Sequence, residues 1–276
     1  MSVRLQRADG GAELIVAGGP AGTRLARLYQ HDPCRVLFPR AELDDPFTAV
    51  LITTSGGLAG GDRISLAIGA EAGATACVTT QAAEKVYRSS GEDTRVNLRL
   101  TVGEGAYLEW VPQETILFDG ARFDRRIGID VTAGGRLLAA ETLVLGRIAR
   151  GERFGRGLLH DSWRVRTGGR LAWADTLRLE DDIPAVLAHP AGFGGAVAQA
   201  TVLALGPGAD TLLAPAREIL DQAEGRAGAT CLGGMLIARF LGSDAQFLRR
   251  DVGRLVAGLR AAWIGLPARV PRLWHV

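Results

Sequence analysis

The sequence is short of several residue types, and each shortage narrows the range of functions. Its three cysteines, Cys34, Cys77 and Cys231, lie far apart and form no C-x-x-C pair. This argues against a disulfide framework or a thiolate zinc site and predicts a reducing, cytoplasmic location. The histidines are few and widely separated, so no zinc or nickel cage is predicted. A net charge of +2 gives no general attraction to nucleic acid or to a membrane surface.

Long apolar runs and common catalytic motifs are also missing. The N-terminal stretch MSVRLQRADGGAELIV lacks the apolar core of a signal peptide, and the longest apolar stretch, residues 231–241, is too short to span a bilayer. The sequence has no G-x-x-x-x-G-K-[ST] phosphate loop, no G-x-S-x-G elbow and no H-E-x-x-H motif. We therefore expect a soluble protein that does not itself hydrolyse a nucleotide.

Lysine is the rarest charged residue, since Lys85 is the only one. With so much alanine, glycine and arginine, this fits the codon bias of a GC-rich genome. The alternative is that position 85 needs a compact ammonium group that arginine cannot replace. The sequence leaves both explanations open.

The residues that are present predict a mainly β fold. The chain has 276 residues, of which 47% are hydrophobic and 22% charged, enough to bury a core. In residues 94–102, Val96, Leu98, Leu100 and Val102 share one face and alternate with polar residues. This period of two is typical of a half-buried strand, and it recurs in residues 64–68 and 123–131.

A weak internal repeat suggests how the strands are arranged. Strand-like segments meet at turns beginning with Gly73, Gly105, Gly135 and Gly169, at intervals of 32, 30 and 34 residues. Repeats of this length favour a stacked, helical β-solenoid in which each layer covers the next. An ordinary antiparallel sandwich with similarly spaced turns is the alternative.

Helices are expected only near the end of the chain. Residues 214–225 form one candidate. A stronger one starts at Ser243, an expected N-cap with Gln246 three residues later as in a capping box, and ends before Pro267. We expect a single domain over residues 1–276, β-rich over 1–212 and helix-containing over 213–276. The second helix carries an apolar stripe that is either core or a partner surface: Leu248, Val252, Leu255, Leu259 and Trp263.

Polar residues gather in a few blocks that follow apolar strands, as is usual for sites and ordered loops. The blocks are TTSGGLAGGDR (53–63), TTQAAEKVYRSSG (79–91), LEWVPQETILFDGAR (108–122), LGRIARGERFGRG (145–157) and the final PRLWHV. In the first block, paired glycines permit positive φ angles and close backbone approach.

These blocks together resemble the UreD (UreH) family of urease accessory proteins. That family shows a G-G-x-x-G-G-D loop, a K-[FVI]-Y-R-S segment, an E-W-x-P-Q stretch, an L-G-R…G-E-x-F stretch and a P-R-x-W end. The corresponding segments here are Gly56–Asp62, Lys85–Ser89, Glu109–Gln113, Leu145–Phe154 and Pro271–Trp274. Each block is weak by itself, but five in the same order span nearly the whole chain.

The resemblance implies a fold and a role. It implies many strands in a helical stack with two helices, and a non-catalytic scaffold that binds UreF and the GTPase UreG and docks on apo-urease. It also implies transient nickel, with no tightly bound cofactor, and an internal tunnel for the metal. Two other functions stay open: an assembly factor without a metal route, and a carbohydrate-active β-solenoid enzyme using paired carboxylates.

Two acidic residues stand inside apolar strands, namely Glu141 in RLLAAETLVLG and Asp175 in RLAWADTLRL. By parity, Asp175 shares an apparent core face with Leu171 and Trp173. A buried carboxylate is costly unless it is paired. It therefore pairs with an arginine, is neutral with a raised pKa, or lines a water-filled passage. Isolated oxygen ligands would bind nickel weakly enough to release it.

Other polar residues are ranked below these two. Asp62 and Glu84 are the next metal-lining candidates, although the family more often has a small polar residue at the position of Glu84. Glu109 and Glu152 could instead anchor turns through Arg122 or Arg147. The polar candidates of second rank are Thr79, Thr80, Gln81, Lys85, Tyr87, Glu109, Gln113, Glu114, Arg147, Glu152 and Asp161. Trp274 joins the helical stripe as a candidate for partner binding.

Overall fold

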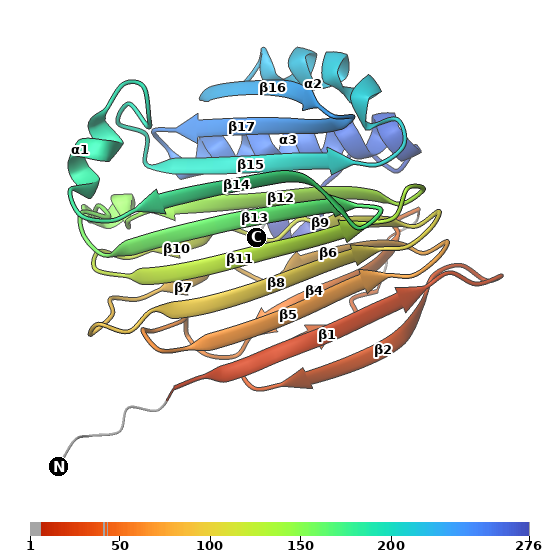
Figure 1. Ribbon diagram of the computed structural model, residues 1–276, viewed down its shortest axis with the longest axis horizontal. Helices are drawn as coiled ribbons and strands as arrows, with labels where there is room; N and C mark the ends of the chain where they lie inside the picture. Colours follow the sequence, from red (N-terminus) through yellow and green to blue (C-terminus); the bar gives the residue numbers. More distant parts are fainter. Residues whose placement is uncertain (1–6, 41, 43, 276) are drawn as a thin grey trace.

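The computed structural model describes residues 7–40, 42 and 44–275. The expectations about the N-terminus and the domain limits therefore lie partly outside the described residues. Two β-sheets face each other and helices cover one end and one side, as Figure 1 shows. Among the described residues, no helix is both long enough and apolar enough to cross a membrane.

The first sheet has seven strands, and all of its central pairs are parallel. From edge to edge they are β14 (Arg170–Leu179), β13 (Leu158–Thr167), β11 (Arg122–Val131), β8 (Thr94–Val102), β5 (Arg63–Ala70), β1 (Asp9–Ala17) and β2 (Arg24–His31).

The second sheet faces the first and has ten strands. Its main path is β16 (Arg226–Leu232), β17 (Met235–Gly242), β15 (Ala198–Leu205), β12 (Arg136–Leu145), β9 (Tyr107–Trp110), β6 (Thr75–Thr80), β4 (Phe47–Thr53) and β3 (Cys34–Leu37). Two short strands, β7 (Glu84–Val86) and β10 (Thr115–Leu117), pair with each other, and β10 also pairs with β12.

The chain climbs from one sheet to the other in stacked coils, which confirms the predicted solenoid. β5, β8 and β11 lie in the first sheet, and each is followed by a strand of the second: β6, β9 and β12. The glycine turns between them stack directly, since the amide of Gly73 donates to the carbonyl of Glu104 at 3.0 Å. Gly73 and Gly105 have φ angles of 68° and 63°, a region that glycine enters without steric cost. The turn at Gly169 differs, because it closes an antiparallel hairpin between β13 and β14.

The core has two layers because the second sheet is buried on both faces. Alternate residues such as Leu100 and Ile129 point between the sheets and are fully buried. The outer face of the second sheet, with Ala140 and Val202, packs under the C-terminal helix. This is why β12 is apolar without alternation, as is usual for strands covered on both sides.

Three α-helices and three 3₁₀ turns complete the fold of the described residues. They are α1 (Ile183–Ala188), α2 (Leu213–Leu220), α3 (Ala245–Ile264), η1 (Ile148–Arg150), η2 (Ala209–Leu212) and η3 (Arg272–His275). The expected helix over residues 214–225 is therefore shorter. The N-cap of α3 is Asp244, not Ser243 as predicted, because the carboxylate of Asp244 accepts the amides of Gln246 at 2.7 Å and Phe247 at 3.2 Å.

The apolar stripe of α3 belongs to the core. Leu248, Val252, Leu255 and Leu259 are at most 2% exposed and pack on the second sheet. Trp263 is half-buried against this cluster. For the four aliphatic side chains the alternative of a partner surface is therefore wrong, because they cover the outer face of the second sheet.

Candidate functional site

Two adjacent cavities open where strands of both sheets end. The inner cavity has a volume of about 80 Å³, lies between the sheets and is lined in part by Trp110, Arg125 and Glu141. The outer pocket, of about 170 Å³, is lined by the segments 51–57 and 80–85. Both cavities share the lining residues Leu51, Thr53, Thr80 and Glu84. These side chains therefore stand between the outer pocket and the interior.

The glycine loop forms one wall of the outer pocket by lying directly against β7. The amide of Leu58 donates to the carbonyl of Lys85 at 2.7 Å, and the hydroxyl of Tyr87 donates to the carbonyl of Gly56 at 2.7 Å. Gly57 has a φ of 140°, and an added Cβ would lie 2.7 Å from the Lys85 carbonyl oxygen. The close backbone approach predicted for this loop is confirmed.

Glu84 is the carboxylate at the boundary between the two cavities. The hydroxyl of Thr53 donates to its Oε2 at 2.7 Å, and the amide of Lys85 lies 3.2 Å from its Oε1. Within the described part of the chain it forms no ion pair with an arginine or lysine. Burial raises the pKa of Glu84, and the Thr53 hydrogen bond opposes this rise. The carboxyl group of Glu84 therefore keeps its proton to a higher pH than an exposed glutamate does.

Glu141 lies deeper, in a charged triad that crosses between the sheets. Its carboxylate accepts from the indole of Trp110 at 2.7 Å and forms an ion pair with Arg125. The Nε of Arg125 donates to Asp161 at 2.7 Å. Burial opposes the charge on Arg125, but the two carboxylates hold its pKa above the ordinary value. The arginine-paired alternative for Glu141 is confirmed, and its pair also lines the inner cavity.

Asp175 does not belong to this site. Its strand β14 is an edge strand, where Leu171 is 57% exposed, so the core face predicted from parity is only partly covered. The side chain of Asp175 is 31% exposed and accepts from Arg239 at 2.8 Å. It lines neither cavity.

Asp62 anchors a loop. It is 6% exposed, and its two carboxylate oxygens accept the amides of Ala8 at 2.8 Å and Ala59 at 2.7 Å. These bonds fix the end of the glycine loop. Asp62 lines neither cavity, so its carboxylate fixes the backbone of the loop and does not face the cavities.

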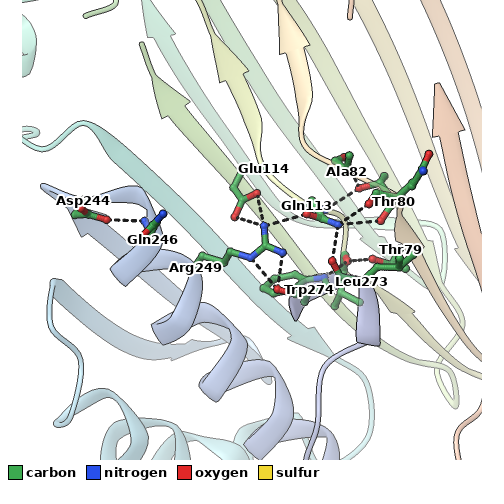
Figure 2. Close-up of polar contacts among 12 residues, drawn as sticks. Thr79, Thr80, Ala82, Gln113, Glu114, Asp244, Gln246, Arg249, Leu273 and Trp274 are labelled. Carbon is green, nitrogen blue, oxygen red and sulfur yellow. Dashed lines mark hydrogen bonds and ion pairs between the residues drawn. The ribbon is translucent and has the colours of Figure 1, made fainter. Parts of the chain in front are cut away.

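Next to the inner cavity, three of the polar blocks meet at Arg249 on α3 (Figure 2). Its Nη1 donates to Gln113 at 2.9 Å and to Glu114 at 3.0 Å, and its Nη2 donates to the carbonyl of Trp274 at 2.6 Å. Gln113 in turn donates to the carbonyls of Gln81 at 2.8 Å and Leu273 at 2.9 Å. The C-terminal turn η3 is thereby fastened to the wall of the cavity.

The threonines of the second block belong to the same network (Figure 2). The carbonyl of Val111 accepts both the hydroxyl of Thr79 at 2.7 Å and the indole of Trp274 at 3.0 Å. The hydroxyl of Thr80 accepts the amide of Gln113 at 2.8 Å. Trp274 is 8% exposed and serves this internal contact, so its assignment to a partner surface is wrong.

A second buried ion pair lies on the other side of the second sheet. Glu109 is fully buried, accepts from the hydroxyl of Tyr107 at 2.7 Å and lies 3.1 Å from Nε of Arg260. The alternative that Glu109 anchors a turn through Arg122 is wrong, since Arg122 binds Asp93.

Sequence reasoning missed Arg249 and Arg260. The available signal was that both lie within one position of the apolar stripe of α3, at Leu248 and Leu259. The other expected turn pair is confirmed, because Glu152 binds Arg147 and also accepts the amide of Asp119 at 3.1 Å.

The side chains that line the two cavities can be judged as possible ligands of a metal ion. Over the described residues, no group of three His, Cys, Asp or Glu side chains is placed to hold a metal ion. The cavities instead offer separated carboxylates and hydroxyls, which favour weak contact with a hard or borderline cation.

Comparison with known proteins gives a consistent result. The family model "UreD urease accessory protein" matches residues 8–275. A "Urease accessory protein UreD 1" of Methylobacterium radiotolerans is 47% identical, with 98% of this chain and 93% of the relative aligned. Proteins named "Urease accessory protein UreD" are 46% identical in Magnetococcus marinus (92% and 89% aligned) and 43% identical in Mesorhizobium japonicum (98% and 95% aligned).

Proposed function

The chain belongs to the UreD family of urease accessory proteins, and from this premise we propose that it is a non-catalytic scaffold that delivers nickel to apo-urease. Its partners are a UreF-like accessory protein, a UreG-like GTPase and the urease subunits. Nickel is cargo in this proposal, and the protein keeps no tightly bound cofactor. The relatives are named for an accessory role, so the carbohydrate-active enzyme is set aside.

The proposed metal route depends on one observation. Glu84 lines both the outer pocket and the inner cavity, and Glu141 lines the inner cavity. A cation that enters beside Glu84 would reach a cavity that holds the second carboxylate among mainly apolar side chains. The triad around Glu141 contains two carboxylates and one guanidinium, and this excess of negative charge favours a cation.

Weak binding suits this role. Imidazole and thiolate ligands hold nickel strongly, whereas isolated carboxylate and hydroxyl oxygens release it more easily. Conduction through a protein requires sites that an ion enters and leaves readily. The oxygen ligands of the two cavities satisfy this requirement.

The experiment measures nickel in urease that has been matured with variants of this chain and its partners. Glu84→Gln and Glu141→Gln keep the size of each side chain and remove its charge, so we expect less nickel per urease with either variant. Asp175→Asn is the matched control, because this carboxylate is also bound to an arginine but lies outside the cavities.

Complex formation is measured in parallel by size-exclusion chromatography. The proposal expects intact complexes with UreF, UreG and urease in all three variants. Full nickel content with both Glu84→Gln and Glu141→Gln would contradict the metal route and favour the assembly factor without such a route.

A further inference from the structure

The outer face of the first sheet is open and carries exposed arginines. In Figure 1 this face is turned toward the viewer, and in the described part of the chain no helix crosses it, since α2 and α3 contact strands of the second sheet. Four exposed arginines project outward from three neighbouring strands: Arg95 and Arg99 from β8, Arg126 from β11 and Arg164 from β13. None of the four lines either cavity of the site described above.

Three of these arginines have side chains without a partner in the chain. Over residues 7–40, 42 and 44–275, the guanidinium groups of Arg95, Arg99 and Arg164 form no ion pair and no hydrogen bond. Arg126 pairs with Asp124 at 3.1 Å, but its side chain is 66% exposed. An ion pair with so exposed a side chain is weak and exchanges readily with a competing carboxylate.

The carboxylates of this face do not compensate the three unpaired arginines. Asp124 lies opposite Arg95 in the ladder, but it is already bound to Arg126 and, at 2.7 Å, to Nδ1 of His160. The other acidic residues of this face lie beside arginines outside the group: Asp9 opposite Arg63, Glu13 against Arg27, Asp130 opposite Arg166 and Glu180 against Arg178. The centre of the face therefore keeps an excess of positive charge, although the whole chain has a net charge of only +2.

The surface between the arginines is low and polar. Arg99 and Arg164 lie in register on either side of Gly128, where an added Cβ would have its nearest neighbour 3.9 Å away. Since one strand separates them, their backbones are about 10 Å apart. The neighbouring outward side chains on the same two strands include Asn97 and Ser162. A carboxylate of another molecule can therefore approach between two guanidinium groups, which bind carboxylates through paired hydrogen bonds.

We propose that these four arginines dock a folded partner protein through an acidic patch on its surface. The partner is one of the urease assembly proteins, so this inference rests on the proposed function. Seven strands of about eight residues form a face of roughly 30 Å by 26 Å. This area matches the roughly 800 Å² that each protein buries in an interface of standard size. A short peptide would cover only part of it.

A protein fits this face better than a nucleic acid strand or a membrane. Single-stranded nucleic acid needs exposed aromatic faces for stacking. Phe123 and Trp163, from β11 and β13, point inward and are at most 2% exposed, and β8 has no phenylalanine, tyrosine or tryptophan. Membrane binding needs apolar side chains that enter the lipid, whereas Asn97, Gly128 and Ser162 lie between the arginines here. Amide and hydroxyl groups instead suit the hydrogen bonds of a protein interface.

The test measures binding of the full chain, immobilised through an N-terminal tag, to the UreF-like protein, the UreG-like GTPase and urease, each added alone and in combination. Arg99→Glu/Arg164→Glu should weaken the binding of one of these partners by about tenfold or more. The wild-type affinity for that partner should fall as the salt concentration rises. Arg99→Lys/Arg164→Lys keeps the charges and should retain most of the binding. The control Arg150→Glu/Arg153→Glu makes the same charge change on exposed arginines outside this face and should bind like the wild type.

Thermal unfolding establishes that the variants are folded, and Arg99→Gln/Arg164→Gln replaces the glutamate variant if that one does not fold. Unchanged binding of every partner to the charge-changed variant, or equal weakening in the lysine variant, would overturn the docking face and leave the proposed function standing. A wild-type chain that binds none of the partners would contradict both. Wild-type binding to a DNA oligonucleotide or to phosphatidylglycerol vesicles that is lost in the variant, while the protein partners still bind, would assign the face to another ligand and overturn the inference.

Discussion

Among the buried and half-buried glutamates described above, Glu84 differs from the others in its partners. Glu109, Glu114 and Glu141 each lie against an arginine, and this pairing compensates much of the cost of burying their charge. Glu84 has a hydroxyl and an amide as donors instead. Burial raises the pKa of Glu84 as it does those of Glu109 and Glu141, but at Glu84 no arginine opposes the rise.

That difference predicts an unusual pH dependence of stability. Because burial raises the pKa of Glu84, the folded protein holds this proton more tightly than the unfolded chain does. As pH rises above the ordinary glutamate range, the free energy of unfolding should fall relative to that of Glu84→Gln, and this difference should level off once Glu84 is ionised in both states. Denaturant titrations of the two proteins at several pH values measure the difference.

Glu152 provides a control of opposite sign. The hydrogen bond from Arg147 lowers the pKa of Glu152, so its contribution is present above the ordinary glutamate pKa and is lost as pH falls. The side chains of Arg147 and Glu152 are 40% and 25% exposed, so solvent screens the pair and the change should be small. A wild-type protein that gains stability over Glu84→Gln as pH rises would contradict the assignment.

At the scale of single elements, the start of α3 gives a sharp test. Asp244 accepts two backbone amides of the first turn, whereas the neighbouring Ser243 makes no such bond. Asp244→Ala should therefore lower the free energy of unfolding by about 1 kcal/mol, the usual cost of losing an N-cap. Ser243→Ala should change it by less than about 0.5 kcal/mol. Equal effects in urea titrations would mean that the cap has been assigned to the wrong residue.

The elements that the sequence predicts correctly are those whose signals are local. The turns at Gly73 and Gly105 need a positive φ, and the stripe from Leu248 to Leu259 needs only helical spacing. Two predictions were wrong for the same reason: that the turn at Gly169 continues the repeat, and that Asp175 lies on a core face. Parity says which residues share a face, but whether another layer covers that face depends on where the stack ends.

The polar site was predictable in part. The blocks that carry Glu84 and Gln113 were identified from their polar residues, and Glu141 was identified as an acid inside an apolar strand. Their partners were not, since Arg249 lies 136 residues from Gln113 in the chain. Such long-range pairs are decided by the docking of α3 on the second sheet, for which a single sequence contains no local signal.

At the scale of the whole molecule, the two sheets are joined by charge as well as by apolar packing. Arg125 comes from β11 in the first sheet, Glu141 from β12 in the second, and Asp161 from β13 beside β11. Arg125 is 4% exposed and makes both ion pairs. A single guanidinium therefore pairs with a carboxylate of each sheet beside the inner cavity.

Removing that guanidinium tests its role in holding the sheets. Arg125→Met keeps a long apolar side chain but leaves Glu141 and Asp161 buried without a cation, so we expect a loss of about 3–5 kcal/mol in the free energy of unfolding. Arg126→Met is the matched control, because Arg126 is 66% exposed and pairs only with Asp124 at the outer face. That variant should lose less than about 1 kcal/mol. Similar losses in both would mean that the inner carboxylates are already neutral or hydrated, and the cavity beside them would then be wetter and less negative than the cation route requires.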